Sequence, residues 1–189
     1  IQISPASKNC INIMEIRKVD NSVNELLDGP TLDASALAGK IQRLHIFFSL
    51  LIPDMSHEEK QLLDEALIKT YARKGITHKN ESLTDPQHPE QYKKMPILED
   101  VYNVLLESED TKRLAHILNR LVHGSASSFN QQTNVDLTNK YTVLDISELT
   151  GSSDLLTVGM FVALDYVWDK AKENRTEEKA IFVDEVWQL

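Results

Sequence analysis

The chain has 189 residues, a length that suits one domain, or one domain with an insertion, around a substantial core. Its net charge of −9, without any Lys- and Arg-rich run interleaved with aromatic residues, excludes a basic nucleic-acid-binding surface in this segment. The single cysteine, Cys10, excludes a disulfide framework and a thiolate metal cluster, and no two histidines have the spacing of a His-x-x-x-His site. We therefore expect a reducing, cytoplasmic compartment.

The N-terminal segment is strand-like. Residues 1–4 alternate apolar and polar side chains and predict a short strand that ends at Pro5. Within residues 9–16, Ile11 and Ile13 are candidates for burial, and Asp-Gly-Pro at residues 28–30 is a turn signal. The chain opens in this strand without a methionine, so we expect it to be a fragment of a longer protein.

A helical pattern begins near Leu32. Apolar residues recur at helical spacing as far as residue 51, and Pro53 marks the end of this helix. Ser56 and Glu59 have the spacing of a capping box that opens a second helix, and Gly75 suits the left-handed position after its end. These residues predict a helical hairpin, followed by an exposed loop over residues 77–96.

Two shorter helices are predicted over residues 97–108 and 110–123. Residues 33–123 should thus form an all-helical block without a chemical motif, and we interpret its charged side chains as solvated faces. The small, polar residues 124–140 lack the glycines and lysine of a phosphate-binding loop and are interpreted as a connecting segment.

The last third of the chain has a strand–helix–strand pattern. Residues 141–146 predict a strand, residues 154–172 a helix in which Gly159 allows a close approach, and residues 180–184 a second strand. Such a unit should have a right-handed crossover and parallel strands. The fold class that follows is α/β, with a partial parallel sheet beside a large all-helical block, so that the chain is mostly helical overall.

Two carboxylates, Asp184 and Glu185, follow the apolar run of residues 180–183 directly. A continuous apolar run predicts a strand buried on both faces, and ligands of parallel sheets bind at the carboxyl ends of the strands. This is the Walker B arrangement of P-loop nucleoside triphosphatases, in which one carboxylate holds Mg²⁺ and another can polarise the attacking water. The alternative is a structural strand that ends in two solvated acids.

The motif also resembles a known family. Residues 181–187, Ile-Phe-Val-Asp-Glu-Val-Trp, resemble the Asp-Glu-aliphatic-Trp Walker B of conjugal-transfer ATPases, the VirB-four-type motors of type IV secretion systems. Residues 11–16, 129–135 and 143–149 resemble further segments of that family, although Ile13 stands where proline is common. The resemblance covers nearly the whole chain and is specific near its C-terminus.

The resemblance implies a RecA-like ATPase core divided into three regions. Residues 1–32 would be an N-terminal strand region, residues 33–123 a helical insertion subdomain, and residues 124–189 the part that ends in Walker B. The implied cofactors are ATP and Mg²⁺, with Asp184 coordinating Mg²⁺ through water and Glu185 as the catalytic base. Asp145 and Glu148 lie near the end of the neighbouring predicted strand, where Asp145 could face the nucleotide, although a structural role is the more usual one.

The resemblance further implies the setting in which the protein works. Its partners would be other type IV secretion components and further copies of itself, up to a hexamer. It would act in plasmid or conjugative-transposon transfer, at the cytoplasmic face of the inner membrane, where its peripheral association runs through partner proteins.

One element of the family is missing from the sequence. The P-loop pattern Gly-x-x-x-x-Gly-Lys-Ser/Thr does not occur, so we expect the parent protein to hydrolyse ATP and the fragment to be inactive. Two alternatives stay open. A DNA-translocating motor of the coupling-protein type would require a basic stripe, and a non-enzymatic interaction module would have no P-loop upstream.

Overall fold

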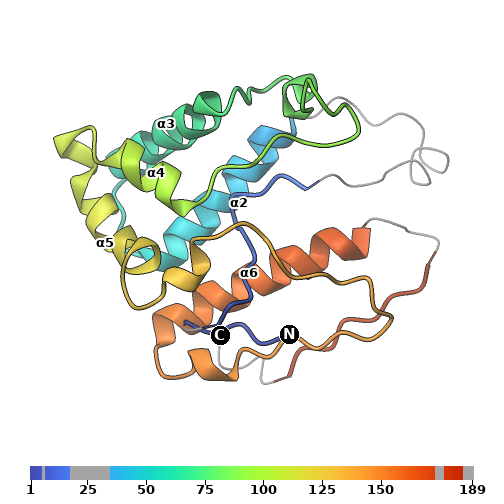
Figure 1. The fold of residues 1–189 in the computed structure, drawn as a ribbon. Coiled ribbons are helices and arrows are strands. Elements are labelled where there is room, and N and C mark those ends of the chain that lie inside the picture. The colour runs from blue at the N-terminus through green and yellow to red at the C-terminus, as the bar shows by residue number, and fades with distance from the viewer. Residues whose placement is uncertain (6, 18–34, 173–176, 185–189) are drawn as a thin grey trace.

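A computed structural model describes residues 1–5, 7–17, 35–172 and 177–184 (Figure 1). Helices dominate these residues. The α-helices are α2 (Ala36–Leu51), α3 (His57–Arg73), α4 (Leu98–Leu105), α5 (Lys112–Val122) and α6 (Ser153–Lys172). Short 3-10 turns are η1 (Asn80–Leu83), η2 (Glu109–Thr111), η3 (Ser127–Phe129) and η4 (Ser147–Leu149). The mostly helical character predicted from the sequence is confirmed.

Local sequence signals account for the helix ends. The Ser35 side chain accepts a hydrogen bond from the Ala38 amide at the start of α2, and Ser56 and Glu59 form the predicted capping box of α3. Gly75 follows α3 with a φ of 70°, the left-handed conformation that glycine adopts without steric cost. The last two helices of the predicted block, α4 and α5, are shorter than expected because η2 turns the chain between them.

The helices form two tiers that share α2 (Figure 1). Helix α3 packs on α2 and on α4, and α4 packs on α5. On its other side, α2 packs against α6, which crosses the lower half of the molecule in Figure 1. The predicted helical block therefore packs on the C-terminal helix mainly through α2, and Arg120 of α5 also lies 3.9 Å from Asp154 of α6.

The segment before Arg17 runs through the core although it has no regular structure. Ile11, Ile13, Met14 and Ile16 are all buried among the helices. The backbone polar groups of this segment find side-chain partners instead of a sheet: Asn134 accepts from the Cys10 amide at 2.7 Å, and the Tyr71 hydroxyl donates to the Met14 carbonyl. These bonds satisfy groups whose burial would otherwise be costly.

The predicted parallel sheet is not found in the described part of the chain. Residues 1–4 and 141–146 meet in a single parallel bridge between Gln2 and Asp145, with hydrogen bonds of 2.8 Å from the Ile3 amide to Asp145 and from the Asp145 amide to Ile1. The two segments thus lie side by side and parallel, but neither is a regular strand. A ladder needs further neighbours, and these two segments share one bridge.

The prediction that residues 180–183 form a strand buried on both faces is wrong for this structure. Phe182 is 93% exposed, and Ile181 and Val183 are 44% and 40% exposed. The run is extended, but among the described residues it has no strand alongside it that would bury either face.

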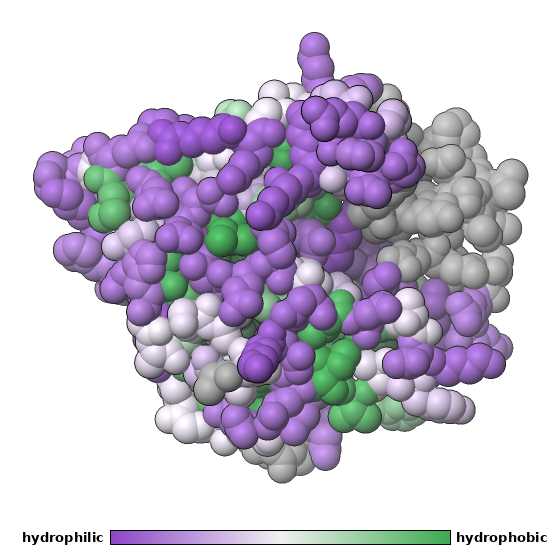
Figure 2. All heavy atoms as spheres, viewed as in Figure 1, coloured by the Kyte–Doolittle hydropathy of each residue, from purple (hydrophilic) through white to green (hydrophobic). Residues whose placement is uncertain are grey.

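The face seen in Figure 2 is mostly hydrophilic over the helical block, with hydrophobic patches in its lower half.

Candidate functional site

The predicted catalytic pair lies only partly within the described residues. Asp184 ends the described run 177–184 and is exposed, whereas Glu185 lies outside the described residues. The run is attached to α6: Lys179 Nζ donates to the Ala171 carbonyl at 3.1 Å, and Ile181 lines an apolar groove together with Leu164 and Trp168. Asp184 is therefore carried on a segment that contacts α6.

Asp145 has a structural partner. Its Oδ1 accepts from the Ser147 amide at 3.0 Å, and this hydrogen bond, with that of the Ser147 hydroxyl, lowers the pKa of the Asp145 carboxyl. The bond stabilises the turn that leads into η4. Glu148, within that turn, is exposed. The position of Asp145 fits the structural interpretation better than a nucleotide contact.

Gly159 allows the predicted close approach on α6. A Cβ atom at this position would lie 2.2 Å from Leu149 Cδ1 and 3.6 Å from Phe129 Cζ. The glycine therefore lets η4 and the connecting segment pack directly on the helix. This contact holds η4, which follows residues 141–146, against α6 and so fixes the position at which the chain enters that helix.

A buried ionic junction, which sequence analysis missed, joins α2 to α6. We use this name for Arg17, Lys40, Arg43, Asp165 and Asp169. Arg43 reaches Asp169 at 2.7 Å and Asp165 at 3.0 Å, and Arg17 reaches Asp169 at 2.9 Å. Lys40 Nζ lies 3.4 Å from Asp165 and donates to the Ile13 carbonyl at 3.2 Å. The junction connects the N-terminal segment, α2 and α6 at one point.

The spacing of these side chains follows from helix geometry. Lys40 and Arg43 are three residues apart on α2, and Asp165 and Asp169 are four apart on α6, so each pair lies on one helix face. Arg17 also stacks over the Tyr166 ring, 4.5 Å from its centroid. The i, i+4 aspartates within a largely apolar stretch of α6 were the available sequence signal, but their partners in the junction are 122 to 152 residues away.

Burial and neighbouring charges have opposite outcomes for two members of the junction, Lys40 and Asp169. Desolvation lowers the pKa of Lys40 to about 8, because the attraction of Asp165 does not compensate for burial and for the nearby Arg17 and Arg43 charges. Burial acts to raise the pKa of Asp169, but the hydrogen bond and charge of Arg43 and the charge of Arg17 outweigh it, so the pKa is lowered. Asp169 is thus held ionised, whereas the lowered pKa of Lys40 brings its ammonium closer to losing a proton.

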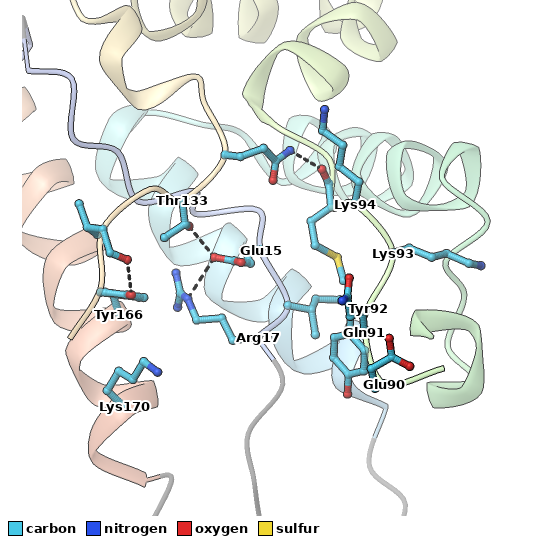
Figure 3. A pocket seen from close by; sticks show the side chains of 14 residues that line it. Glu15, Arg17, Glu90, Gln91, Tyr92, Lys93, Lys94, Thr133, Tyr166 and Lys170 are labelled. Carbon is cyan, nitrogen blue, oxygen red and sulfur yellow. Dashed lines mark hydrogen bonds and ion pairs between the residues drawn. The ribbon is translucent and has the colours of Figure 1, made fainter. Parts of the chain in front are cut away.

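A pocket of about 510 Å³ lies beside the junction (Figure 3). Glu15 and Arg17 line it on one side, with Thr133 donating to Glu15, and Tyr166 and Lys170 line it from α6. Lys93 extends away from the pocket and donates to the Gly75 carbonyl. Acidic and basic side chains are mixed along its walls, which is not the pattern of a phosphate site.

Two further features of the described residues bear on function. They contain no group of three or more His, Cys, Asp or Glu side chains placed to hold a metal ion. No helix in the same residues is both long and apolar enough to cross a membrane. A single carboxylate, Asp184, fits a Mg²⁺ ion held mainly by water and phosphate oxygens, as in nucleotide sites, rather than a metal held by protein ligands alone.

The described residues define a mainly helical protein in which α2 to α5 lie, along the chain, between two parallel segments joined by one bridge, and α2 packs on α6. A solved structure shares this fold: VirB4 of Thermoanaerobacter pseudethanolicus, with a TM-score of 0.80 and 25% sequence identity, over 100% of this chain and 67% of that chain. No protein-family model and no curated protein matches the sequence. The resemblance to VirB-four-type ATPases of type IV secretion systems, inferred from the sequence, is confirmed by this likeness over the whole chain.

Proposed function

We propose that this chain is part of a type IV secretion ATPase that hydrolyses ATP to energise assembly of a conjugal-transfer apparatus and movement of its substrate. The observation that carries the proposal is the Ile-Phe-Val-Asp-Glu-Val-Trp sequence at residues 181–187, in a chain that shares the fold of VirB4 along its whole length. Similarity of the fold alone would not define the chemistry, because function depends on the site. The two adjacent carboxylates supply that site.

Each carboxylate has a proposed role. Asp184 coordinates Mg²⁺ of the nucleotide through water, and Glu185 polarises the water that attacks the γ-phosphate. Bound ATP and Mg²⁺ would supply the phosphoryl group and the charge neutralisation that the reaction requires. The chain itself contributes the two carboxylates and the α6 scaffold that carries their segment.

The phosphate-binding loop of this ATPase must come from residues outside these 189, since the sequence has no P-loop. We further propose that residues 1–32 and 124–189 belong to its RecA-like core and residues 33–123 to a helical insertion. In the complete protein, further copies, up to a hexamer, and other secretion components would be its partners. It would act at the cytoplasmic face of the inner membrane.

The experiment that tests the proposal uses Glu185→Gln in the complete protein. We expect ATP turnover to be lost while ATP binding is kept, because the amide cannot accept the proton of the attacking water. Unchanged turnover would contradict the role of Glu185. Glu178→Gln is a matched control, because Glu178 is an exposed carboxylate a few residues earlier in the same segment.

The isolated chain provides a second measurement. We expect it to show no ATP turnover above background, because it can hold neither the β- nor the γ-phosphate without a P-loop. Turnover by the isolated chain that persists in Glu185→Gln would contradict the assignment of the site.

A further inference from the structure

The junction between α2 and α6 gives one carboxylate three cationic neighbours. Asp165 lies 3.0 Å from Arg43, 3.4 Å from Lys40 and 3.6 Å from Arg17. Asp169 is shared by Arg17, Arg43 and Lys172. Both aspartates therefore keep two arginine partners when Lys40 carries no charge.

Lys40 is the most deeply buried cation of this set. Its side chain is 4% exposed, compared with 8% for Arg17 and 33% for Arg43. The guanidinium groups of Arg17 and Arg43 make the shorter contacts, at 2.9 Å and 2.7 Å to Asp169. The ammonium of Lys40 gains the least from the carboxylates and loses the most solvation, so its charge works against close packing of α2 on α6.

A neutral amine fits the same place without that cost. It can still donate to the Ile13 carbonyl, which lies 3.2 Å away, and it removes the repulsion from Arg17 and Arg43. On α3, Tyr71 donates to the next carbonyl along, that of Met14, and remains neutral because burial raises its pKa. Glu15, which lies 3.4 Å from Arg17, is a further charged group at the junction, and Lys170 and Asp136 lie near Tyr166, over which Arg17 stacks.

We propose that the α2–α6 junction is a proton-linked joint, in which α2 separates from α6 more easily while Lys40 is charged and is held more tightly when Lys40 is neutral. The joint lies where the N-terminal segment, the helical block and the C-terminal helix meet. A change in the charge of Lys40 would thus change how readily the helical block moves relative to α6, while each helix keeps its own structure. The joint is independent of ATP hydrolysis.

The sign of the pH dependence follows from linkage. The Lys40 pKa is about 8 in the closed joint, and a solvated lysine in the open joint has the ordinary value of 10.5. Between these values the open state binds more protons, so opening becomes less favourable as pH rises. These two pKa values correspond to a fall of about tenfold in the opening equilibrium constant from pH 7 to pH 9.

Hydrogen exchange of the α2 and α6 backbone amides at pH 7, 8 and 9, corrected for the intrinsic base-catalysed rate, measures this constant in the folded chain. We expect opening to fall about tenfold over this range in the unmodified protein and to be independent of pH in Lys40→Met. Lys69→Met is the matched control: Lys69 pairs with Glu107 at 2.8 Å but is 55% exposed, so the pH dependence should be retained. The same pH dependence in Lys40→Met and in the unmodified protein would overturn the proposal.

A second measurement uses the unmodified chain and therefore does not require that the Lys40→Met variant fold. The ¹³Cε resonance of Lys40, followed by NMR in the unmodified chain, should titrate in the same pH range in which α2 and α6 become protected. A Lys40 resonance that titrates near the ordinary lysine value, with protection that still rises between pH 7 and 9, would also overturn it.

Discussion

Asp169 shows what burial does to an ion pair. Its side chain is 7% exposed and contacts Arg17, Arg43 and Lys172. Glu107 has a similar set of partners, Lys69 and Arg73, but is 40% exposed. Removing one member of a buried pair leaves charges without solvent or partner, whereas an exposed pair is replaced by water.

We therefore expect Asp169→Ala to lower the free energy of unfolding by about 3–5 kcal/mol at pH 7. Asp169→Asn should be nearly as harmful, because it keeps the volume but not the charge. Glu107→Ala is the control and should change stability far less. Urea unfolding followed by far-UV circular dichroism gives all three values, and equal losses for Asp169→Ala and Glu107→Ala would show that burial is not what makes the junction important.

Helix ends are the elements that sequence predicts best in this chain. The serine of the capping box at α3 accepts from the Glu59 amide at 3.1 Å, and Glu59 Oε2 accepts from the Ser56 amide at 2.8 Å. Both bonds involve residues three positions apart, so nothing distant is needed to form them. For this reason the start of α3 is predicted to the residue.

The cap should make a measurable contribution. We expect Ser56→Ala to lower the free energy of unfolding by about 1 kcal/mol, because it leaves an amide of the first turn without its acceptor. Ser56 is exposed, so no packing is lost with the hydroxyl. Ser56→Asp keeps an acceptor at the same place and should retain most of the stability. A loss in Ser56→Asp as large as in Ser56→Ala would mean that the cap is not the cause.

Strands were predicted less well for a physical reason. The apolar run of residues 180–183 has the composition of a buried strand. A strand is buried only where other elements pack against it, and Phe182 is exposed because no described strand lies alongside the run. The same dependence affects residues 141–146, which make one bridge to Gln2 and leave Tyr141 94% exposed. A helix closes its own hydrogen bonds, whereas a strand cannot, so composition alone does not determine whether a sheet forms.

The same limit applies to the candidate site. Asp184 could be proposed as a site residue from the residues around it, because the Walker B pattern is local in sequence. The ionic junction could not, because Lys40 and Asp165 are 125 residues apart and each has the appearance of a surface charge in its own helix. Only the packing of α2 on α6 brings them together, and that packing is a property of the whole chain.

At the scale of the whole molecule, the N-terminal segment connects parts that the sequence separates. Ile13 is 2% exposed, its carbonyl accepts from Lys40 of α2, and the neighbouring Met14 carbonyl accepts from Tyr71 of α3. Arg17, four residues later, contacts α6 through Asp169. The segment therefore contacts both tiers of helices, and weakening its packing should destabilise both.

We expect Ile13→Ala to lower the free energy of unfolding by about 2–5 kcal/mol, as for other buried aliphatic side chains cut back to alanine. Because the segment lies between the tiers, the backbone amides of α3 and α6 should lose protection against hydrogen exchange together and by similar amounts. Ile68→Ala, at a position on α3 that is 36% exposed, is the control and should have a small effect confined to α3. If Ile13→Ala lowered protection in α6 while α3 kept its own, the two tiers would be independent cooperative units, and the segment would belong to the C-terminal one alone.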